Sequence, residues 1–159
     1  NHKKVRFAID RRISMNYRRM TNEDLDTIIR KYIKYYNDME DGCWTYEQAY
    51  KRIHQVLTIE DSCCLIQCDE RQEITGFAMG YYKEFDDIKS YYLEEIVIFD
   101  GNQNQGYGTD FMMELEHVIR EHGANSIKLI SVNDAHHQHF YTKLGFHAAP
   151  NLFIMGKYF

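Results

Sequence analysis

Two segments in the first third of the chain carry apolar residues at the spacing of amphipathic helices. The first follows Thr21-Asn22-Glu23-Asp24, which has the pattern of a capping box, and is ended by Asp41-Gly42. The second begins near Thr45, where Glu47 and Gln48 follow the cap. The apolar faces are formed by Leu25, Ile28, Ile29, Tyr32, Ile33 and Tyr36 in the first helix, and by Ala49, Ile53, Val56 and Leu57 in the second. We therefore expect two successive helices that each bury one face.

The rest of the chain mixes short apolar runs typical of strands with two further helical patterns. A third helix follows the loop 100–109 and stops at Gly123, and a fourth spans 135–144. Strands are predicted at 16–20, 62–68, 73–82, 91–99 and 126–132, with a strand-rich tail at 146–159. The polar turn 69–72 predicts that two of them pair as an antiparallel hairpin. The order β-α-α-β-β-β-α-β-α-β predicts one mixed α/β sheet flanked by about four helices.

The composition fits one globular domain and excludes several classes of protein. The 159 residues are 44% hydrophobic and 27% charged, which is neither a disordered nor a collagen-like composition. A net charge of -5 argues against a nucleic-acid partner, and no apolar run is long enough to span a membrane, so we expect a cytoplasmic protein. Met15 follows a basic stretch, so residues 1–14 are expected to be an appendage and 15–159 the domain.

The cysteines and histidines do not form the spacing of a zinc site. Cys43, Cys63, Cys64 and Cys68 include no C-x-x-C pair, and three of them lie in an apolar strand as small buried residues. The cluster His136, His137 and His139 has no nearby cysteine to complete a ligand set. We expect no metal.

The loop 100–109 lies between a strand and a helix, where unpaired backbone N–H groups form an anion site. Gly106 and Gly108 lack a Cβ, so their backbone allows close approach of a phosphate group. A simple turn into the helix is the alternative interpretation. Neither G-x-x-x-x-G-K-[ST] nor G-x-G-x-x-G is present, which excludes the two commonest phosphate loops.

The loop residues 103–108 and the later segment 139–146 are two motifs that resemble those of the GNAT superfamily of N-acyltransferases. Gln103-Asn104-Gln105-Gly106-Tyr107-Gly108 is similar to its Q/R-x-x-G-x-G/A acyl-CoA loop. His139-Phe140-Tyr141-Thr142-Lys143-Leu144-Gly145-Phe146 is similar to its F-Y-x-K-L-G-F segment. One helix and one strand separate the motifs, as in that family. The resemblance implies a mostly antiparallel sheet with a splayed parallel pair around an acyl-CoA site.

The resemblance also implies an activity, the transfer of an acetyl group from acetyl-CoA to a primary amine, and residues for it. Glu95 is implied as the base, acting directly or through a water, and Tyr141 as the acid that protonates the leaving thiolate. The coenzyme is expected to contact Ile96, Val97, Ile98, Gln103, Asn104, Gln105, Gly106, Tyr107, Gly108, Thr109 and Asn133. The usual asparagine position holds Asp134, so either Asn133 or Asp134 contacts the coenzyme.

The choice of Glu95 over Glu94 rests on its place eight residues before Gln103, since adjacent strand residues point to opposite faces and phase alone does not decide. Either glutamate is alternatively a solvated or ion-paired residue, and Tyr141 is alternatively an aromatic residue of the core or its rim.

The resemblance implies that the acceptor meets the first two helices, the loop between them and the hairpin loops, and the aromatic rings and carboxylates of this region suit a cation. These are Tyr32, Tyr35, Tyr36, Trp44 and Tyr46, with Asp38, Glu40, Asp41, Glu84, Asp86 and Asp87. Burial of Tyr32 and Tyr36 in the helix face is the alternative, and the acidic loop with Glu84, Asp86 and Asp87 likewise has a purely structural alternative. We expect a small amine of the polyamine or aminosugar type, with a protein amine or a non-catalytic acyl-CoA sensor as alternatives. The apolar segment 152–159 suggests pairing across a homodimer.

Overall fold

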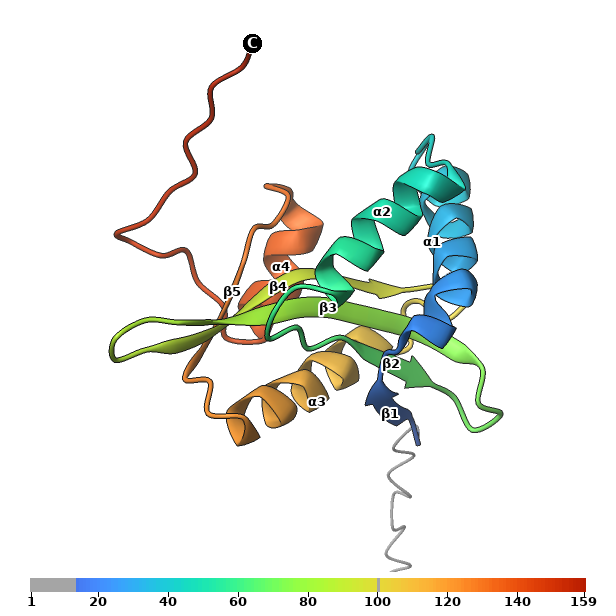
Figure 1. The fold of residues 1–159 in the computed structure, drawn as a ribbon, viewed down its shortest axis with the longest axis horizontal. Helices are drawn as coiled ribbons and strands as arrows, with labels where there is room; N and C mark the ends of the chain where they lie inside the picture. The colour runs from blue at the N-terminus through green and yellow to red at the C-terminus, as the bar shows by residue number, and fades with distance from the viewer. Residues whose placement is uncertain (1–13, 100) are drawn as a thin grey trace, which may run out of the picture. The chain divides into compact units, whose positions relative to one another are not determined.

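The computed structural model describes residues 14–99 and 101–159, which form two compact units, one ending at Lys128 and the other spanning Leu129–Phe159. The predicted appendage 1–14 lies outside the described residues except for Ser14. Figure 1 gives the element labels used below. None of the helices in the described ranges is both long and apolar enough to cross a membrane.

Five strands form one sheet in the order β1-β2-β3-β4-β5. The first four pair antiparallel, which confirms the predicted hairpin, and β4 and β5 form the parallel pair at the end of the sheet. The strands are β1 (Asn16–Arg19), β2 (Leu65–Cys68), β3 (Ile74–Glu84), β4 (Lys89–Ile98) and β5 (Ser126–Leu129). The predicted mixed sheet is therefore confirmed.

The four predicted helices are present, preceded by a short 3₁₀ turn. They are η1 (Asn22–Asp24), α1 (Leu25–Met39), α2 (Tyr46–Leu57), α3 (Tyr107–Glu121) and α4 (Ala135–Lys143). Thr45 caps α2 as predicted: its Oγ1 accepts from the Gln48 backbone N–H at 3.3 Å, and the Gln48 side chain accepts from the Thr45 N–H at 3.0 Å. Gly123, with φ +86, follows the end of α3.

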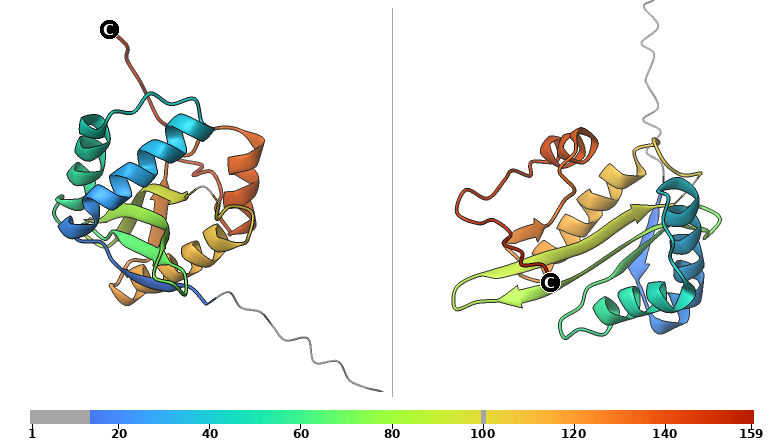
Figure 2. Two further views of the ribbon diagram at one scale, coloured as in Figure 1. Left: turned by 90° about the vertical axis from the view of Figure 1, so that its right-hand side faces the viewer. Right: turned by 90° about the horizontal axis from the view of Figure 1, so that it is seen from above.

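Helices α1 and α2 cover one face of the sheet in the first unit, and α3 covers the other (Figures 1 and 2). The core beneath α1 and α2 contains the predicted apolar faces, with Ile28, Ile29 and Ile53 against Phe77 and Val97 of the sheet. The opposite face is covered by the apolar residues of α3, of which Phe111, Met112, Leu115 and Ile119 are buried. The 3.6-residue period predicted these faces because burial of one stripe is what stabilises such a helix.

A β-bulge interrupts the pairing of β3 with β4 at Glu94. Met79 pairs with Glu95 and Gly80 with Leu93, so Glu94 has no opposite residue in β3. A bulge of this kind bends the strand and redirects the side chains beside it. The bulge lies immediately before Glu95, the residue predicted as the base.

Strand β5 covers only the first part of β4. The Asn125 N–H donates to the Lys89 carbonyl at 2.9 Å, and the hydroxyls of Ser90 and Ser126 are 2.7 Å apart. Since a strand rises about 3.3 Å per residue, the four residues of β5 end near Leu93. The two strands therefore cannot pair along the stretch of β4 that follows the bulge.

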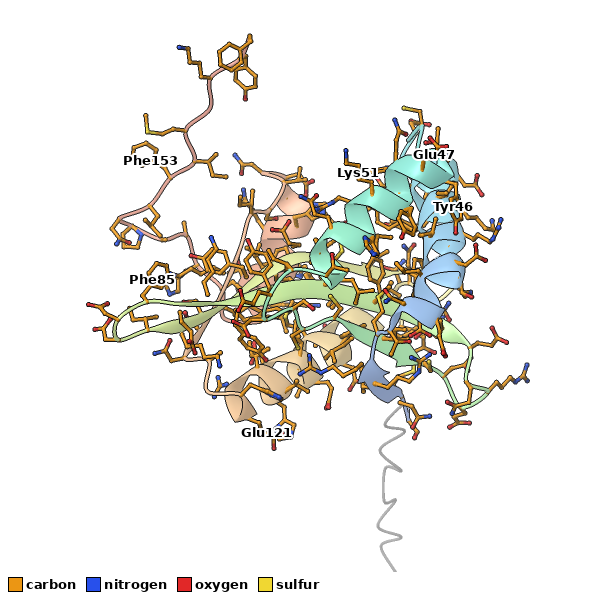
Figure 3. All side chains as sticks on the ribbon, in the orientation of Figure 1. Tyr46, Glu47, Lys51, Phe85, Glu121 and Phe153 are labelled. Carbon is orange, nitrogen blue, oxygen red and sulfur yellow. The ribbon has the colours of Figure 1, made fainter. Side chains whose placement is uncertain are left out.

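The predicted strand-rich tail at 146–159 is not a strand in the described residues. Its large apolar side chains are exposed, with Phe153 (Figure 3) and Met155 both 83% exposed. Pro150 lacks the N–H that a strand ladder uses, and a strand also requires a neighbour that its own pattern does not specify. The dimer expected through 152–159 stays a prediction.

Candidate active site

The Glu95 carboxylate on β4 lies among three side chains from α1 and α2. The Tyr32 hydroxyl donates to Glu95 Oε2 at 3.1 Å, and the Tyr36 hydroxyl donates to Oε1. An Arg52 guanidinium nitrogen lies 3.7 Å from Oε2. The Glu95 side chain is only 14% exposed. These contacts make Glu95 a largely buried, positioned carboxylate rather than a freely solvated one.

Two opposing effects set the pKa of this carboxyl group. Burial disfavours the charged form and raises the pKa of Glu95 above its usual range. The Tyr36 hydrogen bond, the positive charge of Arg52 and the Tyr32 hydrogen bond favour the carboxylate and oppose that rise. Burial wins, so the group is a stronger base than an exposed glutamate.

Arg52 contacts both neighbouring glutamates. Its guanidinium lies 3.3 Å from Glu94 Oε2 as well as 3.7 Å from Glu95 Oε2. The expectation that two adjacent strand residues face opposite sides of the sheet is therefore wrong here, because the bulge at Glu94 breaks the regular alternation. Glu94 is more exposed, at 34% of its side chain.

Arg52 is the residue that sequence reasoning missed. One charged residue within a helix carries no motif. Its signal is its place beside Ile53, at the edge of the apolar face formed by Ala49, Ile53 and Val56. An arginine at such an edge covers apolar surface with its stem, and here the charged end reaches the two carboxylates of β4.

Four of the five aromatic residues predicted for the acceptor gather above Glu95. The Tyr32 and Tyr36 rings are 4.5 Å apart, Tyr32 and Trp44 5.2 Å, and Tyr35 and Tyr36 5.0 Å. The Asn37 side chain holds the α1–α2 loop closed through both the N–H and the carbonyl of Trp44, at 2.9 and 3.0 Å. Tyr32 is 2% exposed, which confirms the alternative that its ring belongs to the buried helix face, although its hydroxyl also donates to Glu95.

Tyr46 does not join this aromatic cluster. Its hydroxyl donates to Asp26 Oδ1 at 2.7 Å, and the Arg30 guanidinium lies 5.4 Å from its ring centre. Both partners are in α1, over which Figure 3 labels Tyr46, whereas Glu47 and Lys51 lie on the side of α2 away from the sheet. The sequence grouped Tyr46 with the others because it is close to Trp44 in the chain, but at the start of α2 its side chain contacts Asp26 and Arg30 of α1 instead.

Few of the predicted carboxylates lie near the aromatic cluster. Glu40 contacts it, as acceptor from the Tyr35 hydroxyl at 3.4 Å, whereas Asp38 pairs with Lys34 on the surface of α1. The hairpin residues Glu84, Asp86 and Asp87 are at the other end of β4, beside Phe85 in Figure 3. Six strand residues, or roughly 20 Å, separate Glu95 from the start of that strand.

The glycine loop folds back against the end of β4. The Gln103 side chain donates to the Ile98 carbonyl at 3.1 Å and also interacts with the Tyr35 hydroxyl. Gly106 caps α3 with φ +81, which glycine adopts without strain, and a Cβ at this position would meet nothing within 4 Å. The first intrahelical bond runs from Asp110 N–H to the Gly106 carbonyl, so the N–H groups before it have no acceptor within the helix. This geometry fits a phosphate group.

The three residues that follow Glu95 in β4 differ in the exposure of their side chains. Ile96 and Ile98 are half-buried, whereas Val97 is 4% exposed and packs in the core. A contact of Val97 with a coenzyme would therefore use its backbone.

The second unit contains the remaining predicted residues on and before α4. The Tyr141 ring packs against Phe140 at 5.1 Å and Phe146 at 5.4 Å. Asp134 caps α4 by accepting from the His137 backbone N–H at 2.8 Å. Asn133 is exposed and accepts a hydrogen bond from the Gln138 side chain. Since Asp134 is engaged as a cap, Asn133 is the better candidate for a coenzyme contact.

The cysteines and histidines are residue types that could form a metal set or, for a cysteine, a covalent acyl carrier. The four cysteines are free, and Cys63, Cys64 and Cys68 are buried whereas Cys43 is exposed. Burial raises the pKa of the Cys64 thiol to about 11, so it is not a nucleophile at neutral pH. Within residues 14–99 and 101–159, no group of three or more His, Cys, Asp or Glu side chains could hold a metal ion.

The chain belongs to the acetyltransferase (GNAT) family, whose profile matches residues 25–146. The match includes Glu95, the glycine loop and Tyr141, and identifies the protein as an acyltransferase. A sequence search against curated proteins gives no match.

Solved structures share the fold at low sequence identity. A possible acetyltransferase from Clostridium difficile 630 has a TM-score of 0.76 at 11% identity and covers 91% of this chain and 98% of its own. The aminoglycoside N-acetyltransferase AAC(6')-Iy in complex with CoA has a TM-score of 0.69 at 13% identity, with 91% and 95% covered. A transcriptional regulator from Bacillus halodurans C-125 has 0.70 at 18%, with 91% and 100% covered.

Replacement of Arg52 by glutamine is expected to move the acid limb of the pH profile of kcat/KM to higher pH. The positive charge of Arg52 favours the ionised carboxylate, so its removal raises the pKa of Glu95 further above its usual range. Activity that requires the carboxylate is then lost at a higher pH as the solution is acidified, whereas the plateau at high pH is largely retained. The measurement is kcat/KM from pH 5 to 9.

The matched control for Arg52→Gln is Lys51→Gln, which removes the same charge from the outer side of the same helix (Figure 3). Its acid limb should coincide with that of the wild type. Equal shifts in the two variants would mean that net charge, not the contact with Glu95, sets the limb.

Proposed function

We propose that this protein transfers the acetyl group of acetyl-CoA to a primary amine of a small cationic molecule. The observation that carries the proposal is a largely buried, hydrogen-bonded carboxylate, Glu95, on β4. It is followed in the chain by a glycine loop that leads into the N-terminus of α3. Glu95 and Ile98 are three strand residues apart, or about 10 Å. A carboxylate that can accept a proton, followed along the chain by a loop that suits an anion, supports this reaction.

The donor would be held by backbone groups of this strand and loop. The N–H groups of residues 103–109 and the positive end of α3 suit its diphosphate. The stretch after the bulge, with Ile96, Val97 and Ile98, is the part of β4 that the short β5 does not reach, and it suits the amide-containing pantetheine arm. An Ile98 N–H directed at the thioester carbonyl would stabilise the oxyanion. We also assign Asn133 a contact with the coenzyme.

Glu95 takes a proton from the acceptor ammonium, directly or through a water, because an amine with a pKa near ~10.4 is mostly protonated at neutral pH. The neutral nitrogen then bonds to the thioester carbon and the carbonyl oxygen becomes the oxyanion, which re-forms the carbonyl as the carbon–sulfur bond breaks. Tyr141 gives its proton to the leaving thiolate, and the nitrogen releases its second proton. The net reaction converts an ammonium and a thioester into an amide, a thiol and one proton.

The aromatic cluster supports a cationic acceptor. Tyr35, Tyr36 and Trp44 are partly exposed beside Glu95, and ring faces attract ammonium groups. Glu40 adds a carboxylate at the edge of the cluster. These features suit a polyamine or aminosugar better than an uncharged amine.

The test is calorimetric titration of the protein with acetyl-CoA, CoA and ATP, followed by release of free thiol with a panel of amines. We expect saturable binding of acetyl-CoA and CoA and thiol release with a polyamine or aminosugar. Release only with a peptide amine would replace the small acceptor by a protein one. Binding without turnover would favour a sensor, and absence of acetyl-CoA binding would contradict the proposal.

A further inference from the structure

Gln67 is a buried polar side chain whose role the reaction described above does not include. It lies in β2 and is 0% exposed, and every residue of that strand is buried. A buried carboxamide destabilises a protein unless hydrogen bonds satisfy it. Its partners therefore show what it holds in place.

The partners connect three strands with the first turn of α3. The Gln67 amide nitrogen donates to the Tyr107 backbone carbonyl at 2.9 Å and to the Tyr17 hydroxyl at 3.0 Å. Its carbonyl oxygen accepts from the Thr75 hydroxyl at 2.8 Å. The Tyr17 hydroxyl in turn donates to the Asp110 carboxylate. The network thus holds α3 at two positions of its first turn.

The bond to Tyr107 also fixes a donor of the anion site. The Tyr107 carbonyl and the Gly108 N–H belong to one planar peptide group, so holding the carbonyl fixes the direction of the N–H. Gly108 precedes Asp110, whose N–H makes the first intrahelical bond of α3. Its N–H is therefore one of those that helix geometry leaves for a ligand.

The bond from Tyr17 acts on the charge of the same turn. Asp110 is a carboxylate in the first turn of α3, where a negative charge would repel a bound phosphate. Tyr17 lies in β1 and its ring packs on Phe111 at 5.3 Å, so its hydroxyl holds this carboxylate on the β1 side of the helix.

We propose that Gln67, together with Tyr17, is a positioning residue for the diphosphate of the acyl donor. It sets the direction of the Gly108 N–H, and Tyr17 holds the Asp110 charge in a fixed place. This inference rests on the proposed function, since it assigns the network to the binding of the same donor.

The test compares two donors in the variant Gln67→Met, which keeps the side-chain length but removes its hydrogen bonds. Acetyl-CoA carries the diphosphate, whereas S-acetyl-pantetheine has the same thioester and arm without it. We expect kcat/KM for acetyl-CoA to fall about tenfold, through KM, as for the loss of one or two well-placed hydrogen bonds. The value for S-acetyl-pantetheine should stay at the wild-type level.

Ser90→Ala is the matched control, because it removes another fully buried hydrogen-bonding side chain, one that contacts Ser126 of β5 rather than α3. It should affect both donors equally. If Gln67→Met does not fold, Tyr17→Phe removes only the hydroxyl and is expected to show the same donor dependence.

The possible failures are distinguishable. Equal losses with the two donors in Gln67→Met would show a general structural role and overturn the inference, with the proposed function intact. Wild-type protein that binds neither acetyl-CoA nor CoA would overturn the proposed function itself.

Discussion

Glu95→Gln is expected to lower kcat/KM for the acceptor amine by about 10²- to 10⁴-fold, the usual contribution of a general base. Glutamine keeps the shape and accepts hydrogen bonds through one oxygen, but it cannot take a proton. Burial raises the pKa of the Glu95 carboxyl above its usual range, and the reaction requires the carboxylate. Wild-type activity therefore rises with pH through that pKa and falls as the group is protonated on acidification.

The loss in Glu95→Gln should be largest at low pH. At high pH more of the amine is already neutral and depends less on a base. The measurement is kcat/KM for one amine from pH 5 to 10 in both proteins. A wild-type pH profile in the variant would exclude Glu95 as the base.

Glu94→Gln is the matched control, since Glu94 is the neighbouring residue and pairs with the same Arg52. Its side chain is more exposed than that of Glu95 and contacts neither tyrosine in the hydrogen bonds described above. We expect it to retain most of the activity. If Glu94→Gln caused the larger loss, the base would be Glu94.

Tyr141→Phe is expected to lower kcat by roughly 10²-fold or more while the affinity for acetyl-CoA changes little. Phenylalanine keeps the ring that packs between Phe140 and Phe146, so α4 should remain folded. Only the hydroxyl that would protonate the leaving thiolate is lost. Steady-state kinetics and calorimetric titration with CoA separate the two effects.

Tyr158→Phe serves as the control for Tyr141→Phe, because Tyr158 is a tyrosine of the same unit that is 95% exposed. It should behave as the wild type. Unchanged kcat in Tyr141→Phe would remove Tyr141 as the acid and leave the thiolate to be protonated by solvent.

The elements that could be predicted are those whose signal is local. The apolar face of α1 and the Thr45 cap of α2 depend on residues close together in the chain, and both are present in the structure. The tail at 146–159 was predicted wrongly for the complementary reason: a strand is stable only beside another strand, and its own apolar pattern does not supply one.

The candidate site likewise contains residues that the sequence predicted and residues that only the folded structure brings together. The loop containing Gly106 and the segment containing Tyr141 are contiguous motifs, so the sequence alone identified them and the family they belong to. The place of Glu94 was not predictable, because the bulge that brings both glutamates to Arg52 arises from pairing with β3.

What the sequence alone determined is therefore the order of the elements, their buried faces and the family to which the chain belongs. Only the tertiary structure brought Tyr32, Tyr36 and Arg52 to the Glu95 carboxylate, and Gln67 to the first turn of α3. The physical reason is that these contacts join residues about 40 to 60 positions apart in the chain. The local pattern of apolar residues does not predict such distant pairs. Burial nevertheless makes them necessary, because a buried polar or charged side chain destabilises the protein unless a partner satisfies it.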